Sequence, residues 1–267
     1  MSYSTTTMVK EMTLSEQIFD SYLSNREIKF KVEQGHLVHP DRFLSLPQGL
    51  VICEIKQLES KINRARIVTS FFNPYKKLRN AIKKKVRQGK EAKKDNVPYV
   101  IVIFNYNSHQ ITSNEIVEAV MYGDITIVID IPQDIKKRGK VRGNFFAGNG
   151  SLRYARDHQE PGVPIKKRIS AIAILEIINP TDELLSLEYN KASKGISIQE
   201  IDKLFIILDE ITEKLEKEGK YKKDLRIPRL RVFHNFYASN PLGFKVFNGK
   251  YDKQYYIDPA TGQSRKY

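Results

Sequence analysis

Two uninterrupted apolar runs constrain the fold of this chain more than any other feature. Leu50–Cys53 and Val100–Phe104 contain no polar residue, and Ile125–Ile129 is a third, nearly apolar run. A strand whose neighbouring residues are all apolar is typical of a sheet that is covered on both faces, because successive side chains point to opposite sides. The sequence therefore predicts strands inside an α/β layer.

Helical patterns alternate with these strands. From Ser15, apolar residues recur at spacings of three and four and predict a helix that is capped by Thr13 or Ser15. A basic helix is predicted over 75–94, and Ser113 can cap another. Two further extended segments, at 28–32 and 43–44, precede Leu50. The order is helix, three-strand meander, helix, strand, helix, strand, which predicts an α/β fold with crossovers.

The rest of the chain is divided by composition. Residues 132–167 are basic and glycine-bearing and predict a long surface loop between a core over 1–131 and a C-terminal α+β extension over 168–267. In that extension, strands are predicted at 169–178 and 230–236. The strongly amphipathic segment 198–217 is interpreted as a core helix, and a homodimer contact is the alternative.

Composition narrows the class of protein. The chain has 267 residues and a formal net charge of +14, so an acidic solubility module is excluded. Cys53 is the single cysteine, which excludes an internal disulfide and favours a reducing compartment. No apolar run reaches the roughly 18 residues of a membrane span, and the first ten residues do not have the pattern of a signal peptide. We therefore expect a cytoplasmic protein without a membrane partner.

Catalytic or metal-binding residues are expected where charged side chains interrupt an apolar run. Glu54 and Lys56 directly follow the run at 50–53, and strand alternation places both on one face with Ile55 on the other. Asp41, in a Pro-Asp pair upstream, can bring a second carboxylate against Glu54. Two adjacent carboxylates repel, and a bound divalent cation or a raised pKa relieves the repulsion. Mg²⁺ or Mn²⁺ held by oxygen ligands suits phosphodiester hydrolysis.

This pattern has a simpler reading. Acid-x-Lys triplets occur six times in the chain, so the triplet alone carries little information. Only 54–56 ends an apolar run, and Pro40-Asp41 is the only Pro-Asp pair. The alternative is a strand end that emerges into solvent with an ion pair.

With Pro40-Asp41 and Glu54-Ile55-Lys56, the chain resembles the PD-(D/E)xK nuclease superfamily over about residues 13 to 131. The resemblance implies a restriction-endonuclease-like core, Asp41 and Glu54 as metal ligands and Lys56 as a catalytic residue. It also implies a supporting acid on the first helix, matched here by Glu16, which otherwise reads as a first-turn acid stabilised by the helix dipole. Gln88 is followed by Ala92 rather than Tyr, so the RecB-like branch is not indicated.

The basic helix predicts a nucleic-acid surface. Residues 61–94 contain thirteen Lys or Arg and one acid, and neutralising phosphates with such charge supplies most sequence-independent affinity. A solvated helix face is the alternative. A second basic patch at 136–142 is either a nucleic-acid contact or a soluble loop. The expected binding residues are Lys76, Lys77, Arg79, Lys83, Lys84, Arg87 and Gln88.

The sequence thus predicts a Mg²⁺- or Mn²⁺-dependent endonuclease, with DNA favoured over RNA as substrate. The resemblance implies a role in defence, repair or mobile-element processing. One rival is a non-catalytic nucleic-acid-binding protein that keeps the nuclease fold. Another is an assembly subunit that uses the 198–217 helix.

Overall fold

The computed structural model describes residues 12–32, 40–58, 74–86, 96–105, 113–130, 140–147, 153–154, 163–164, 166–257 and 264–266. The chain divides into two compact units. The first comprises residues 1–175 and 230–267, and the second comprises residues 176–229.

The first unit is built on an eight-stranded mixed sheet with the order β1-β2-β3-β4-β9-β10-β11-β12. The strands are β1 Lys29–Lys31, β2 Arg42–Leu46, β3 Gly49–Leu58, β4 Tyr99–Asn105, β9 Ala171–Ile178, β10 Ile227–His234, β11 Lys253–Ile257 and β12 Ser264–Lys266. Strands β1, β2 and β3 form an antiparallel meander, whereas β3, β4 and β9 are parallel. The α/β class and the three-strand meander that the sequence predicts are confirmed.

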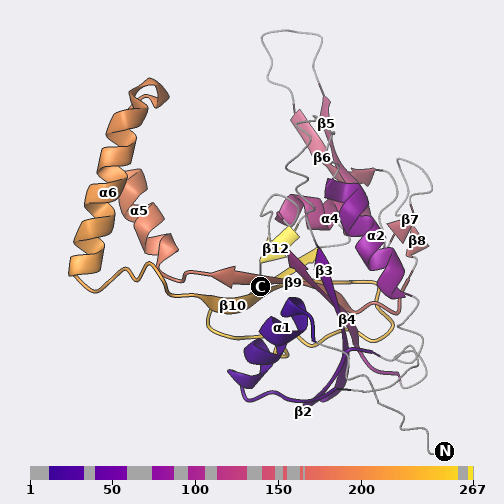
Figure 1. Cartoon of the computed structure of the whole chain (residues 1–267). Helices are drawn as coiled ribbons and strands as arrows, with labels where there is room; N and C mark the ends of the chain where they lie inside the picture. Colours follow the sequence, from indigo (N-terminus) through magenta and orange to yellow (C-terminus); the bar gives the residue numbers. More distant parts are fainter. Residues whose placement is uncertain are drawn as a thin grey trace, which may run out of the picture. The chain divides into compact units, whose positions relative to one another are not determined.

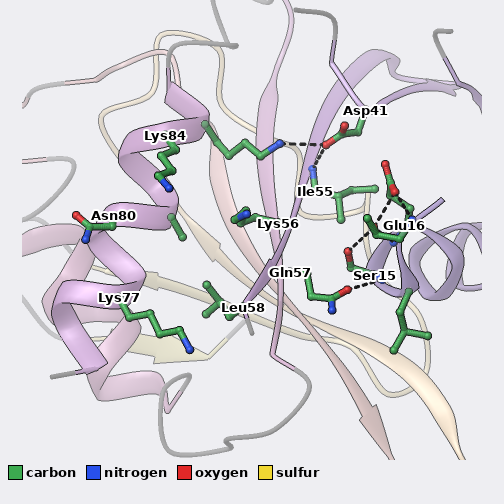
Figure 2. A pocket seen from close by; sticks show the side chains of 14 residues that line it. Ser15, Glu16, Asp41, Ile55, Lys56, Gln57, Leu58, Lys77, Asn80 and Lys84 are labelled. Carbon is green, nitrogen blue, oxygen red and sulfur yellow. Dashed lines mark hydrogen bonds and ion pairs between the residues drawn. The ribbon is translucent and has the colours of Figure 1, made fainter. Parts of the chain in front are cut away.

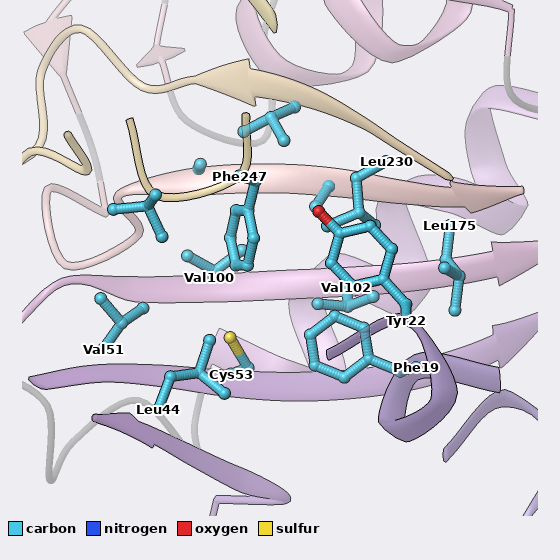
Figure 3. Close-up of a cluster of buried hydrophobic side chains, with 14 of the residues drawn as sticks. Phe19, Tyr22, Leu44, Val51, Cys53, Val100, Val102, Leu175, Leu230 and Phe247 are labelled. Atoms are coloured by element: carbon cyan, nitrogen blue, oxygen red, sulfur yellow. The ribbon is translucent and has the colours of Figure 1, made fainter. Parts of the chain in front are cut away.

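Helices cover both faces of this sheet, which explains why β3 and β4 are apolar on both sides. Helix α1, Leu14–Ser24, packs on one face, and α2, Pro74–Val86, packs with α4, Asn114–Tyr122, on the other (Figure 1). Figure 3 shows Phe19 and Tyr22 of α1 over the centre of the sheet. Burying each large apolar side chain contributes about 1.5–3 kcal/mol, so the two layers anchor β3 firmly between them.

Alternate residues of β3 belong to different cores. Val51, Cys53 and Ile55 pack on the α1 side, whereas Ile52 and Leu58 pack on the α2 side. The residues between Ile52 and Leu58 with the same parity are Glu54 and Lys56. Both charged side chains therefore belong to the α2 face of the sheet, as strand alternation predicts.

The predicted strand at 125–129 does not join the main sheet. It forms β5, Asp124–Asp130, which pairs antiparallel with β6, Lys140–Ala147, in a separate two-stranded sheet. The predicted loop over 132–167 therefore contains β6 and also two short strands, β7 Arg153–Tyr154 and β8 Val163–Pro164. The register passes from Val128 opposite Gly143 to Ile129 opposite Val141. This bulge and the adjacent Gly143 interrupt the alternating pattern of β6, so the sequence alone does not indicate that strand.

The second unit contains the helices α5, Asp182–Ala192, and α6, Ile201–Lys217, with a short 3₁₀ turn at Ile198–Glu200 before α6. The sequence predicts α6 as a core helix, but Leu215 is the only buried residue of α6, and Phe205 is 59% exposed. The core interpretation is therefore wrong, because the apolar stripe of α6 is wider than one neighbouring helix can cover. The homodimer alternative stays a prediction. In the part of the chain that the structure describes, no helix is long and apolar enough to cross a membrane.

Candidate active site

The register of the β2–β3 hairpin brings Asp41 and Glu54 together. A two-residue turn at Pro47 and Gln48 connects the strands, and Arg42 lies opposite Cys53. One residue further along the same register, Asp41 is opposite Glu54. Opposite residues of an antiparallel pair point to the same face with Cβ atoms about 4.5–5.5 Å apart. The spacing between the two acids in the sequence is thus the spacing that this hairpin requires.

Asp41 is held at the point where β2 begins. Its Oδ2 accepts a hydrogen bond of 2.6 Å from the backbone N–H of Ile55, which would otherwise continue the ladder with the residue before Asp41. That residue is Pro40, whose ring fixes its backbone and removes its own N–H. The Asp41 carboxylate therefore replaces the backbone carbonyl that would otherwise accept this hydrogen bond. The bond holds the carboxylate beside β3.

A buried ion pair fixes the backbone of Asp41 as well. Arg42 is almost fully buried, and its guanidinium donates to both carboxylate oxygens of Asp20, from Nε at 2.6 Å and from Nη2 at 2.8 Å. Nη1 also donates to the carbonyl oxygen of Asp41 at 2.6 Å. Because Asp20 belongs to α1, this pair ties the helix, the start of β2 and the candidate site together.

We expect Arg42→Ala to destabilise the protein by about 3 kcal/mol, because it leaves the partly buried Asp20 carboxylate without its partner. Urea unfolding would measure the change, with Lys31→Ala on the exposed surface of β1 as the control. A loss no larger than that of the control would show that the ion pair does not hold α1 on the sheet.

Glu54 is fully buried, and it shares a cation with Asp41. The ammonium of Lys85 on α2 pairs with Glu54 Oε1 and lies 3.5 Å from Asp41 Oδ2. Among the described residues, Glu54 Oε2 has no hydrogen-bond partner. Burial and then the nearby Asp41 carboxylate raise the pKa of Glu54 to about 7, although Lys85 opposes the shift.

The raised pKa of Glu54 predicts a pH-dependent stability. Between its ordinary pKa of 4.5 and the folded value of about 7, the folded protein binds a proton that the unfolded chain does not. Stability should therefore fall as the pH rises through this window, by at most about 1.4 kcal/mol per pH unit. Urea unfolding from about pH 5 to about pH 7 with a chelator would measure it. Glu54→Gln should flatten the profile, and equal slopes in both proteins would contradict the assignment.

Lys56 follows Glu54 by two residues on the same face of β3, and it lines a cavity together with Asp41, whereas the fully buried Glu54 does not line that cavity. The cavity has a volume of about 710 Å³ and lies between α1, β3 and α2. Figure 2 shows the Lys56 side chain between β3 and α2. The residues that line the cavity are Thr13, Leu14, Ser15, Glu16, Asp41, Ile55, Lys56, Gln57, Leu58, Lys77, Asn80, Ala81, Lys84 and Lys85.

Glu16 reaches the cavity from α1 and caps that helix. Its Oε2 accepts hydrogen bonds from the backbone N–H of Thr13 at 2.6 Å and from the Thr13 hydroxyl at 2.7 Å. The backbone N–H of Glu16 donates in return to Thr13 Oγ1, which completes a capping box. The structure thus gives Glu16 the role of a first-turn acid, and it resolves the two predicted caps in favour of Thr13.

The predicted nucleic-acid residues on α2 separate into two groups. Lys77 and Lys84 line the cavity, whereas Lys76 and Lys83 are exposed and Arg79 is half-buried. Arg87 and Gln88 lie outside the described residues, as does most of the second basic patch. Burial, and then the charge of Lys83, lower the pKa of Lys166.

Lys85 is the site residue that the sequence pattern does not reveal. It belongs to the run Lys83-Lys84-Lys85, in which composition does not show which lysine points inward. Helical spacing contains a signal, since Lys85 follows the buried Ala81 by four residues and Ile82 by three. Its carbonyl oxygen accepts a hydrogen bond of 2.7 Å from the hydroxyl of Tyr99 on β4.

The donor set fits a hard divalent cation in one respect. Asp41 and Glu54 supply carboxylate oxygens, and Glu54 Oε2 is buried without a hydrogen-bond partner in the described ranges. The structure does not provide a third such side chain, because its described residues contain no group of three or more His, Cys, Asp or Glu that could hold a metal.

Comparisons with family models, with curated proteins and with solved structures gave no match to this chain. The fold and the site define an α/β protein in which the buried Glu54 carboxylate is paired, through Lys85, with Asp41 at a cavity that four lysines line.

Proposed function

We propose that the protein is a divalent-cation-dependent endonuclease of the PD-(D/E)xK type. The observation that carries the proposal is the convergence of Asp41 and Glu54 on one cation position, beside Lys56 on the same face of β3. The order α1, β1–β3, α2, β4 supports a restriction-endonuclease-like core. The full burial of Glu54 argues against the alternative of an ion pair at an exposed strand end, and buried charged groups with perturbed pKa values gather at functional sites.

Each charged residue of the candidate site has a role in this proposal. Asp41 and Glu54 would hold Mg²⁺ or Mn²⁺, which when bound would supply Lewis acidity at the phosphate. The ammonium of Lys56 would orient the attacking water or stabilise the negative charge that develops on the phosphate oxygens. Ile55 N–H holds Asp41 in place, and Glu16 supports the site by capping α1 at the cavity wall.

Nucleic acid, with DNA favoured over RNA, is the proposed substrate. Lys77 and Lys84 extend the positive charge of the cavity along α2, and Lys76 and Lys83 continue it onto the exposed surface. A polyanionic backbone can follow these lysines without base-specific contacts.

A non-catalytic nucleic-acid-binding protein is the second candidate, and one observation favours it. Lys85 compensates the charge of Asp41 and Glu54 with a residue of the chain itself. A nuclease fold that has lost its activity would retain such an internal ion pair together with the basic helix.

Cleavage assays distinguish the two candidates. Purified protein would be incubated with single- and double-stranded DNA and RNA in Mg²⁺, in Mn²⁺ and in a chelator. The proposal expects cleavage with Mg²⁺ or Mn²⁺ that the chelator abolishes. Nucleic-acid binding without cleavage under every condition would favour the second candidate.

A further inference from the structure

We propose that Lys85 competes with the divalent cation for Asp41 and Glu54, and that on release its ammonium binds a phosphate of the nucleic acid. The inference rests on the proposed function and adds a coupling between its two ligands. When nucleic acid is present, its phosphate would attract Lys85 away from Asp41 and Glu54, and the two carboxylates could then bind the cation.

The competition follows from the atoms involved. Lys85 Nζ pairs with Glu54 Oε1 and with Asp41 Oδ2, which are oxygens of the two proposed ligand side chains. The Lys85 side chain is only 15% exposed, so its ammonium lies inside the site. A divalent cation and an ammonium repel each other, and they cannot both occupy the space between these carboxylates. Binding of the cation therefore requires Lys85 to move away.

The backbone of Lys85 is fixed, so the movement is confined to its side chain. Tyr99 is fully buried on β4, and its hydroxyl donates to the Lys85 carbonyl oxygen at 2.7 Å. Leu78 and Ile82 pack the same helix into the core of the sheet. A lysine has four rotatable side-chain bonds, and so its ammonium can leave the carboxylates while α2 stays in place.

The cavity offers the released ammonium another partner. Lys77, Asn80, Ala81, Lys84 and Lys85 line the cavity at spacings of three and four residues, so they form one face of α2. A phosphate held by Lys77 and Lys84 would attract the Lys85 ammonium away from Asp41 and Glu54. Nucleic acid should then tighten cation binding, and by linkage the cation should tighten nucleic-acid binding by the same factor.

The first test follows Lys85 in the unaltered protein. Lysine acylation would be quantified by mass spectrometry with and without Mn²⁺, with Lys84 as the control on the same helix. Acylation of Lys85 should rise several-fold when Mn²⁺ is added, while Lys84 changes little. If Mn²⁺ binds but the acylation of Lys85 does not change, the inference is wrong and the proposed function stands.

The second test measures affinity for Mn²⁺ by calorimetry. Lys85→Met should bind Mn²⁺ roughly tenfold more tightly than the unaltered protein, because the cation no longer displaces an ammonium. Lys31→Met, on the exposed surface of β1, should bind as the unaltered protein does, and Glu54→Gln should lose binding. An unchanged affinity in Lys85→Met would overturn the competition. If none of these proteins binds Mn²⁺, the cation-dependent function itself fails. The acylation test applies even if Lys85→Met does not fold.

Discussion

Protein that carries Asp41→Asn is expected to fold and to bind nucleic acid, but to cleave it about 10²–10⁴ times more slowly. The asparagine amide oxygen can still accept the hydrogen bond from Ile55 N–H, so the start of β2 should be preserved. A neutral amide is a poor ligand for a hard cation, and Mn²⁺ affinity should therefore fall as well. Cleavage rates, gel shifts and calorimetry on one preparation would measure the three effects.

A second variant, Lys56→Ala, separates cation binding from the cleavage step. Lys56→Ala is expected to lose most of the cleavage while it retains both Mn²⁺ and nucleic-acid binding, since an interaction made only in the transition state affects turnover rather than affinity. Lys31→Ala, on the exposed surface of β1, is the control and should cleave normally. Cleavage that survives both Asp41→Asn and Lys56→Ala would mean that the active site lies elsewhere.

The second large effect concerns the affinity for nucleic acid. Replacing Lys76 and Lys83 with Glu should weaken binding strongly and reduce the slope of log affinity against log salt by about 0.7–0.9 for each phosphate that the protein no longer neutralises. These two side chains are exposed, so their replacement should leave the core of α2 intact. Titrations at several salt concentrations would give the slope.

The second unit provides a matched control for this charge reversal. Residues 176–229 contain ten Lys or Arg against twelve Asp or Glu, whereas the remainder of the chain contains 35 against 19. Lys203→Glu with Lys217→Glu on α6 alters the same number of exposed lysines in a region that is not positively charged. It should leave the salt slope unchanged. Equal losses in both pairs would show that net charge, rather than the surface of α2, determines binding.

The sequence predicts the centre of the fold because local patterns determine it. Doubly buried strands are apolar on both faces, and the turn at Pro47 and Gln48 sets the pairing that brings Asp41 to Glu54. Strand alternation is sufficient to place Glu54 and Lys56 on one face. These features depend on residues that are close together in the chain, which is where pattern reasoning is strongest.

The features that the sequence does not predict depend on packing between distant segments. Lys85 enters the site because α2 crosses the sheet beside β3, and helical spacing distinguishes it from its two neighbouring lysines only once the buried face of α2 is known. The strand β5 resembles a strand of the main sheet, but it pairs with β6 instead. The choice of strand partner and the rotation of a helix about its axis are properties of the packed structure.

The β2–β3 hairpin should tolerate substitution more readily than a change of length. Asp41 faces Glu54 only while the number of residues between them preserves the register, because a shift of one residue turns a strand side chain to the other face of the sheet. A single insertion or deletion within β2 or β3, between the turn and either acid, would send one carboxylate toward α1 and the other toward α2. In sequences that share this site, the exposed residues between the two acids are free to vary in kind, whereas differences in the length of the strands should occur in pairs.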